Sequence, residues 1–119
     1  MTTIRMVIAR PIPSANERDK WHWRKRYQET KAWEIMLRCA VPRPPVRPTY
    51  KVHVTILSRR TALIHDDANL RAGAKGLVDA LVRVGFLKDD SDTWTHIDYH
   101  QVQAPKPFRG TAITLKGPA

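Results

Sequence analysis

The chain has 119 residues, 42% of them hydrophobic, and a formal net charge of +10 at pH 7. This length favours one domain with a modest core, and the apolar content excludes a basic disordered tail. No apolar run approaches the roughly 18–20 residues that span a bilayer, and a single cysteine excludes an intramolecular disulfide. We therefore expect a cytoplasmic protein with no membrane partner, and the positive charge makes nucleic acid the expected ligand.

The first third of the chain predicts a strand and a long helix. Residues 3–9 alternate between apolar and polar side chains, as a strand does. Ser14 to Glu17 has the S-x-x-E spacing of a capping box, which starts a helix. One helix is expected within about 17–40, and its apolar residues at core-facing spacing are Ala32, Ile35, Met36 and Cys39.

The middle of the chain predicts a connector, a strand and a second helix. Residues 41–48 contain four prolines, which is typical of an exposed, extended connector. Residues 50–58 alternate most clearly of all, and Arg59-Arg60 is expected to end that strand. Residues 69–84 have helical apolar spacing, with Gly85 as the stop signal.

Two more strands are expected near the C-terminus, at about 94–103 and 111–116, joined by a loop at 105–110. The predicted order is β-α-β-α-β-β. We therefore expect an α+β fold, a mixed α/β layer structure, in a single domain over residues 1–119.

Acidic side chains are concentrated in two short turns. Five of the eleven Asp and Glu residues lie there: Asp66, Asp67, Asp89, Asp90 and Asp92. Crowded negative charge is unfavourable unless something offsets it, and carboxylate oxygens suit Mg²⁺ or Mn²⁺. A carboxylate site inside a basic protein is typical of a metal-dependent nuclease.

Spacing alone argues against a shared site for these two turns. They flank the helix expected at 69–84, and about 16 helical residues extend roughly 24 Å. The turns converge only if one of them folds back along the helix, or if a second copy supplies one. Asp66 and Asp67 are explained equally well as acids that complement a helix N-terminus.

Several basic residues are candidates for phosphate contacts that position DNA without reading its sequence. These are Arg59 and Arg60, before the first acidic turn, and the cluster Arg24, Lys25 and Arg26. Trp21 and Trp23 are interleaved with that cluster. They are candidates either for stacking on unpaired bases or for the core or a dimer interface.

Four segments, in chain order, resemble the RusA family of Holliday junction resolvases. Pro13-Ser14-Ala15-Asn16 is similar to the family's P-S-x-N loop, and Asp66-Asp67-Ala68-Asn69-Leu70 to its D-x-D-N-L segment. Lys75 and Asp79-Ala80-Leu81 resemble its helix lysine and D-A-L. Gly85 to Asp90 matches its G-x-x-x-D-D turn. The resemblance covers about residues 4–103.

The resemblance implies a homodimeric endonuclease that makes paired, symmetric nicks in four-way DNA junctions with Mg²⁺ or Mn²⁺. Asp66 matches the first carboxylate of D-x-D-N and Asp90 the last carboxylate of the acidic turn, so both would be metal ligands. Lys75 matches the helix lysine, which would act at the scissile phosphate. These three residues are the expected catalytic set, with Asp67 as a further candidate ligand.

Ala68 departs from the family pattern, because the second Asp of D-x-D-N falls on it and a methyl group offers no ligand atom. Three explanations are open. Asp67 serves instead, or the protein is a weakened or inactive relative, or Ala68 replaces an aspartate by design. The alternative function is therefore a non-catalytic protein that keeps this fold and binds structured DNA. An RNA-binding module is less favoured, since RNP-like aromatic motifs are missing.

Overall fold

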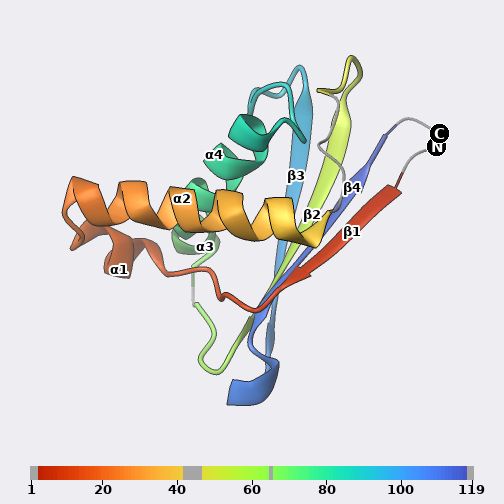
Figure 1. Ribbon diagram of the computed structural model, residues 1–119. Coiled ribbons are helices and arrows are strands. Elements are labelled where there is room, and N and C mark those ends of the chain that lie inside the picture. Colours follow the sequence, from red (N-terminus) through yellow and green to blue (C-terminus); the bar gives the residue numbers. More distant parts are fainter. Residues whose placement is uncertain (1–2, 42–46, 65, 118–119) are drawn as a thin grey trace.

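A four-stranded mixed sheet organises the molecule (Figure 1). The computed structural model describes residues 3–41, 47–64 and 66–117. Within them the strands are β1 (Thr3–Ile8), β2 (Val52–Arg60), β3 (Thr95–Gln103) and β4 (Gly110–Lys116), in the spatial order β1-β4-β2-β3. Strand β4 is antiparallel to both of its neighbours, whereas β2 and β3 are parallel.

Helices cover one face of this sheet (Figure 1). The described residues form four α-helices: α1 (Ala15–Asp19), α2 (Trp23–Ala40), α3 (Asp67–Gly73) and α4 (Lys75–Val84). A 3₁₀ turn, η1 (Lys106–Phe108), precedes β4. Helices α3 and α4 together form the crossover that parallel neighbours such as β2 and β3 require. The result is one α+β domain, as the sequence predicts, and none of the described helices is long and apolar enough to cross a membrane.

The hydrophobic core lies between the helices and the inner face of the sheet. On the strands, the predicted alternation is confirmed: every second residue of β2 from Val52 to Ser58 is buried, and the residues between them are exposed or half-buried. Other strand and helix residues complete the core: Met6, Ile8, Ile113, Leu115, Trp33, Leu37, Leu70, Leu77 and Leu81. Burial of these side chains is the main force that holds the helices on the sheet.

The helix expected within 17–40 is in fact two helices, so that prediction is wrong in its continuity. Ser14 caps α1 as the capping box predicts, since its Oγ accepts a hydrogen bond from the Glu17 amide at 3.1 Å. The chain then breaks at residues 20–22. His22 is extended and starts α2, because its Nδ1 accepts a hydrogen bond from the Arg24 amide at 3.3 Å.

The core-facing side of α2 also differs from the prediction. Ile35 is 63% exposed and Cys39 is exposed, while Trp33 and Leu37 are fully buried. Two glutamates and a threonine share the buried side: Glu29, Thr30 and Glu34. An apolar pattern cannot identify a helix face whose buried positions are partly polar.

The second helical segment is interrupted as well. Residue Ala74 ends α3 and begins α4 with a ψ of −2°, where one continuous helix is predicted. Its neighbour Gly73 packs so closely on the Pro13 carbonyl that a Cβ there would overlap the oxygen. Gly85, with a φ of 106°, ends α4 as predicted.

The predicted connector precedes β2, and β2 extends further than predicted. Residues 42–46 of the predicted connector at 41–48 lie outside the described residues. Strand β2 continues through Arg60, so the prediction that Arg59-Arg60 ends the strand before these residues is wrong. Both arginines pair with β3 in parallel register.

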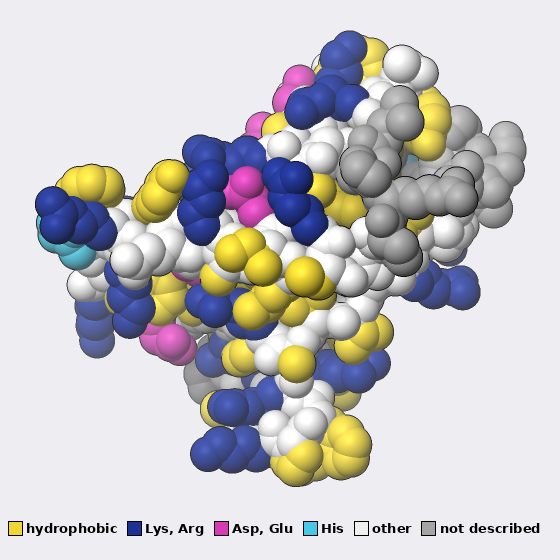
Figure 2. All heavy atoms as spheres, in the orientation of Figure 1, with side chains coloured by type: hydrophobic (Ala, Val, Ile, Leu, Met, Phe, Trp, Pro, Cys, Tyr) yellow, Lys and Arg dark blue, Asp and Glu magenta, His cyan; other side chains and the backbone are white. Residues whose placement is uncertain are grey.

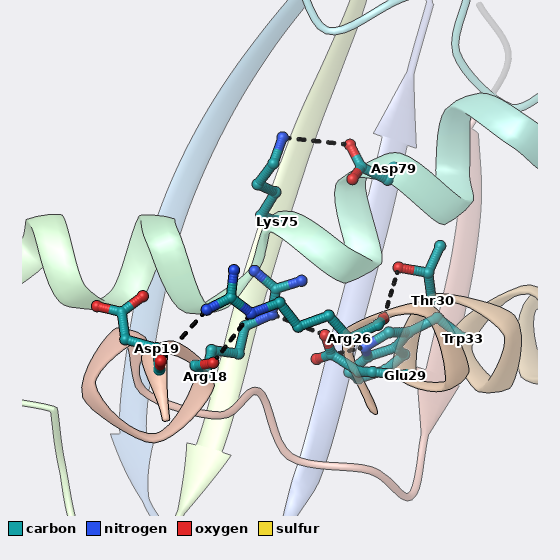
Figure 3. A network of polar contacts seen from close by, with 8 residues as sticks. All are labelled: Arg18, Asp19, Arg26, Glu29, Thr30, Trp33, Lys75 and Asp79. Atoms are coloured by element: carbon teal, nitrogen blue, oxygen red, sulfur yellow. Dashed lines mark hydrogen bonds and ion pairs between the residues drawn. The ribbon is translucent and has the colours of Figure 1, made fainter. Parts of the chain in front are cut away.

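A buried carboxylate joins three of the helices (Figure 3). Glu29 of α2, with a side chain only 1% exposed, accepts a hydrogen bond from Arg18 Nε of α1 at 2.8 Å and one from Trp33 Nε1 at 3.3 Å. Gly76 of α4 lies against the same carboxylate, where a Cβ would overlap Glu29 Oε1. Arg26 adds bonds to the Arg18 and Asp19 carbonyls. The network thereby fixes α1, α2 and α4 relative to one another.

Replacing Glu29 by Gln should destabilise the fold by roughly 3–5 kcal/mol, because the buried Arg18 charge loses its counter-ion. Urea unfolding measures the loss. Glu17→Gln is the matched control, because Glu17 pairs with Arg60 at 3.5 Å but its side chain is 54% exposed. This variant should lose less than about 1 kcal/mol of unfolding free energy. Equal losses for the two variants would contradict a central role for Glu29.

Candidate functional site

The first acidic segment lies at the start of α3. Asp66 is the N-cap of this helix, and its Oδ1 accepts a hydrogen bond from the Ala68 amide at 2.8 Å. Asp66, Asp67 and Ala68 are all exposed. Asp66 therefore has the capping role that the sequence leaves open, and its second carboxylate oxygen has no hydrogen-bond partner among the described residues. His65, beside it, lies outside the described part of the chain.

The second acidic segment lies in the loop between α4 and β3. Asp89 accepts hydrogen bonds from the hydroxyl and the amide of Ser91, and these hold the pKa of the Asp89 carboxyl below its usual value. This bonding is that of a turn residue. Asp90 is exposed, and its side chain has no hydrogen-bond partner or ion pair among the described residues. Of the two, Asp90 is the carboxylate available to a ligand.

Tyr99, in the middle of β3, interacts with Arg71 of α3 and with the charge of Asp90. The Arg71 guanidinium of α3 lies 5.5 Å from the centre of the Tyr99 ring. Burial raises the pKa of Tyr99 above its ordinary value of 10.0, the Arg71 charge opposes this rise, and the Asp90 charge adds to it. Arg71 of α3 and the charge of Asp90 therefore both act on Tyr99.

The donor set fits a hydrated Mg²⁺ or Mn²⁺ better than a tightly caged ion. In the described part of the chain, no three His, Cys, Asp or Glu side chains form a group that could hold a metal. What α3 and the loop offer is exposed carboxylate oxygen, from Asp66, Asp67 and Asp90. Mg²⁺ is commonly bound by one or two carboxylates together with substrate phosphates and several waters.

Lys75, which is expected to act at the scissile phosphate, forms an ion pair with Asp79. Its Nζ lies 3.8 Å from Asp79 Oδ1, one turn along α4, and Figure 3 shows the two side chains pointing toward each other. The Lys75 side chain is 64% exposed. Such a pair contributes little to stability and is readily exchanged for another anion, so a phosphate contact stays a prediction.

The basic residues predicted to contact DNA are placed in two regions, and Figure 2 shows Lys and Arg in several separate patches on the visible face. Arg24 and Lys25 are exposed at the start of α2, where they lie over the Trp23 and Trp21 rings respectively. Arg26 is instead engaged with α1 carbonyls. Arg24 and Lys25 are therefore the freer of the three for a phosphate contact.

The two arginines at the end of β2 also differ. Arg60 donates to the carbonyls of Ile12 and Ala62 and pairs with Glu17, so its guanidinium braces the loops around it. Arg59 is half-buried, and its side chain has no hydrogen bond or ion pair among the described residues. Of this pair, Arg59 retains the greater capacity for a phosphate.

Two of the motif segments come into contact. Helix α1, which follows Pro13-Ser14, packs against α3, and Gly73 meets the Pro13 carbonyl. Sequence reasoning missed Arg71 and Tyr99 as neighbours of the acidic segments. The only available signal was weak: Tyr99 is at an inward position of an alternating strand.

Comparison with known proteins adds no further constraint, because no protein-family model and no curated protein sequence matches this chain. The resemblance to RusA resolvases stands on the motif residues and their order.

Asp90→Asn should lower the pKa of Tyr99, because the Asp90 charge raises it, and Arg71→Gln should raise it further. The tyrosinate absorbance of each variant, minus that of its Tyr99→Phe counterpart, measures this pKa. The pKa of Tyr99 is higher in the folded than in the unfolded protein, so the free energy of unfolding should fall as pH rises above about 10. The fall should be smaller in Tyr99→Phe, which lacks this titrating group. An unchanged Tyr99 pKa in both variants would mean that the loop and α3 do not meet at this strand.

Proposed function

We propose that the protein is a metal-dependent endonuclease that acts on four-way DNA junctions, with Asp66 and Asp90 as its principal metal ligands. The observation that supports this proposal is that Arg71 of α3 contacts Tyr99 and that the charge of Asp90 acts on the same residue. A shared metal site additionally requires Asp66, at the start of α3, to lie close to Asp90. Contact between α1 and α3 adds support, since it joins two segments on which the resemblance to RusA resolvases rests.

Each residue has a role that its surroundings permit. Asp66 caps α3 through Oδ1 and keeps its other oxygen for an ion. Asp90 is exposed, and Arg71 is the nearby cation that would hold the DNA strand against two carboxylates. Lys75 would release Asp79 to neutralise charge on the scissile phosphate. The bound ion would supply an activated water and stabilise the leaving oxygen.

The net charge of +10 supports DNA as the substrate. A polyanion is drawn to such a surface, and Lys and Arg that engage phosphates supply most of the sequence-independent affinity. Arg59, Arg24 and Lys25 are the basic residues with the greatest freedom for it. A homodimer is the simplest assembly for this reaction, because a two-fold symmetric enzyme places paired nicks on a two-fold symmetric junction.

Ala68 favours a second candidate, a protein that keeps the fold and binds structured DNA without cutting it. Its exposed methyl group stands where the resemblance implies a carboxylate, and it leaves the site one ligand short. Both candidates predict junction binding. They differ only in cleavage.

A nicking assay on a synthetic four-way junction separates the two candidates. The chain should bind the junction and cut it slowly with Mg²⁺. Ala68→Asp should accelerate symmetric nicking roughly ten-fold or more. Mutating a residue that only orients a metal ligand already changes metal affinity or activity by about that factor. The gain should vanish when EDTA replaces Mg²⁺.

Two controls make this assay decisive. Ala68→Asn has nearly the same shape but no negative charge, so it should gain far less than Ala68→Asp. Ala68→Asp combined with Asp90→Asn should lose the gain. Binding without nicks in every variant would establish the DNA-binding alternative, and no preference for the junction over plain duplex would refute both candidates.

A further inference from the structure

A hollow of about 480 Å³ lies where the chain leaves β1, β2 ends and β4 begins. None of the acidic residues of the two turns lines it. Its volume is within the roughly 300–1,000 Å³ of sites that hold a small organic ligand. Its floor is partly apolar, since Pro11, Ile12 and Pro13 contribute to it.

The hollow is strongly basic. Three arginines line it, Arg10, Arg60 and Arg109, against a single acid, Glu17. Glu17 is already paired with Arg60 at 3.5 Å. Among the described residues, Arg10 and Arg109 form no ion pair. Two arginines without a counter-ion therefore line the hollow, which suits an anion such as a phosphate, although the Arg10 guanidinium also lies 5.5 Å from the centre of the Trp33 ring.

An aromatic ring forms one wall. Trp21 lines this hollow and also a second one of about 260 Å³, which Arg10 and Lys25 line with it. Lys25 Nζ lies 4.5 Å from the centre of the Trp21 ring. Lys25 lines only the second hollow. The half-exposed Trp21 ring thus has a cation against it and borders both hollows.

We infer that this hollow binds an unpaired nucleotide of the DNA, with the base stacked on Trp21 and the phosphate between Arg10 and Arg109. Aromatic rings and arginines in a positive groove are the usual means of holding single-stranded nucleic acid, because every base has a face that stacks. Paired bases in duplex are already stacked and cannot enter. The inference deepens the proposed function, since a branched DNA offers unpaired nucleotides where its strands exchange.

Binding of a fluorescently labelled oligothymidine, in EDTA so that cleavage plays no part, tests the inference. Trp21→Ala should weaken binding roughly five- to hundred-fold, the usual effect of losing one stacked base, and Trp21→Phe should retain most of it. Tyr27→Ala is the matched control. Tyr27 is 52% exposed and has Lys31 over its ring at 5.4 Å, yet it lies outside the hollow, so its loss should change binding little.

The charge of the hollow gives an independent measurement. Arg109→Gln should make the dependence of log Kd on log salt shallower by about 0.7, the value for one phosphate contact on a single strand. Arg5→Gln, an exposed arginine of β1 outside the hollow, should leave the slope unchanged.

Equal losses for Trp21→Ala and Tyr27→Ala, or no loss for either, would overturn the inference. The inference would also be overturned if oligouridine of the same length bound more tightly than oligothymidine and its binding depended equally on Trp21, because the hollow would then be a site for RNA. Failure here is distinguishable from failure of the proposed function: oligothymidine binding needs neither a metal nor a junction, and nicking of the junction does not report on Trp21 alone.

Discussion

The buried Glu29 carboxylate is the interaction on which the arrangement of the helices depends. It joins Arg18 of α1, Trp33 of α2 and the surface of Gly76 in α4. A buried charge is tolerated only with a close partner and further hydrogen bonds, and both are present here. Because α4 follows α3 directly after Ala74, the same carboxylate also limits where α3 lies on the sheet. The position of the acidic residues therefore follows from a contact in which none of them takes part.

The parallel pairing of β2 with β3 imposes a second constraint. The chain leaves β2 at one end of the sheet and must enter β3 at the other, so α3, α4 and their loops have to cross the sheet face. Asp66 precedes this crossover and Asp90 ends it. Tyr99, which pairs with Ile56 in mid-strand, is contacted by Arg71 of α3 and is affected by the charge of Asp90. The function proposed for the carboxylates requires Asp66 to lie close to Asp90 across this crossover.

The strands were predictable from the sequence, and the breaks between helices were not. Alternation in residues 50–58 reports one-sided burial directly, and Gly85 is a local stop signal. The interruption at Ala74, in contrast, accompanies a close contact between Gly73 and Pro13, which no local pattern reveals. The buried side of α2 was predicted wrongly because Glu29, Thr30 and Glu34 belong to it. Motif residues identified Asp66 and Asp90, while Arg71, Tyr99 and the hollow beside Trp21 depend on tertiary neighbours and became visible only in the fold.

Paramagnetic broadening by Mn²⁺ tests the central claim most directly, because it reports how near each backbone amide is to one bound ion. In ¹⁵N-labelled protein, the amides of residues 66–67 and 89–90 should broaden together at the same Mn²⁺ concentrations, and Asp90→Asn should weaken the effect at both segments. Broadening of one segment alone, or of the two at clearly different concentrations, would show that the carboxylates belong to separate places on the surface and would contradict a shared site.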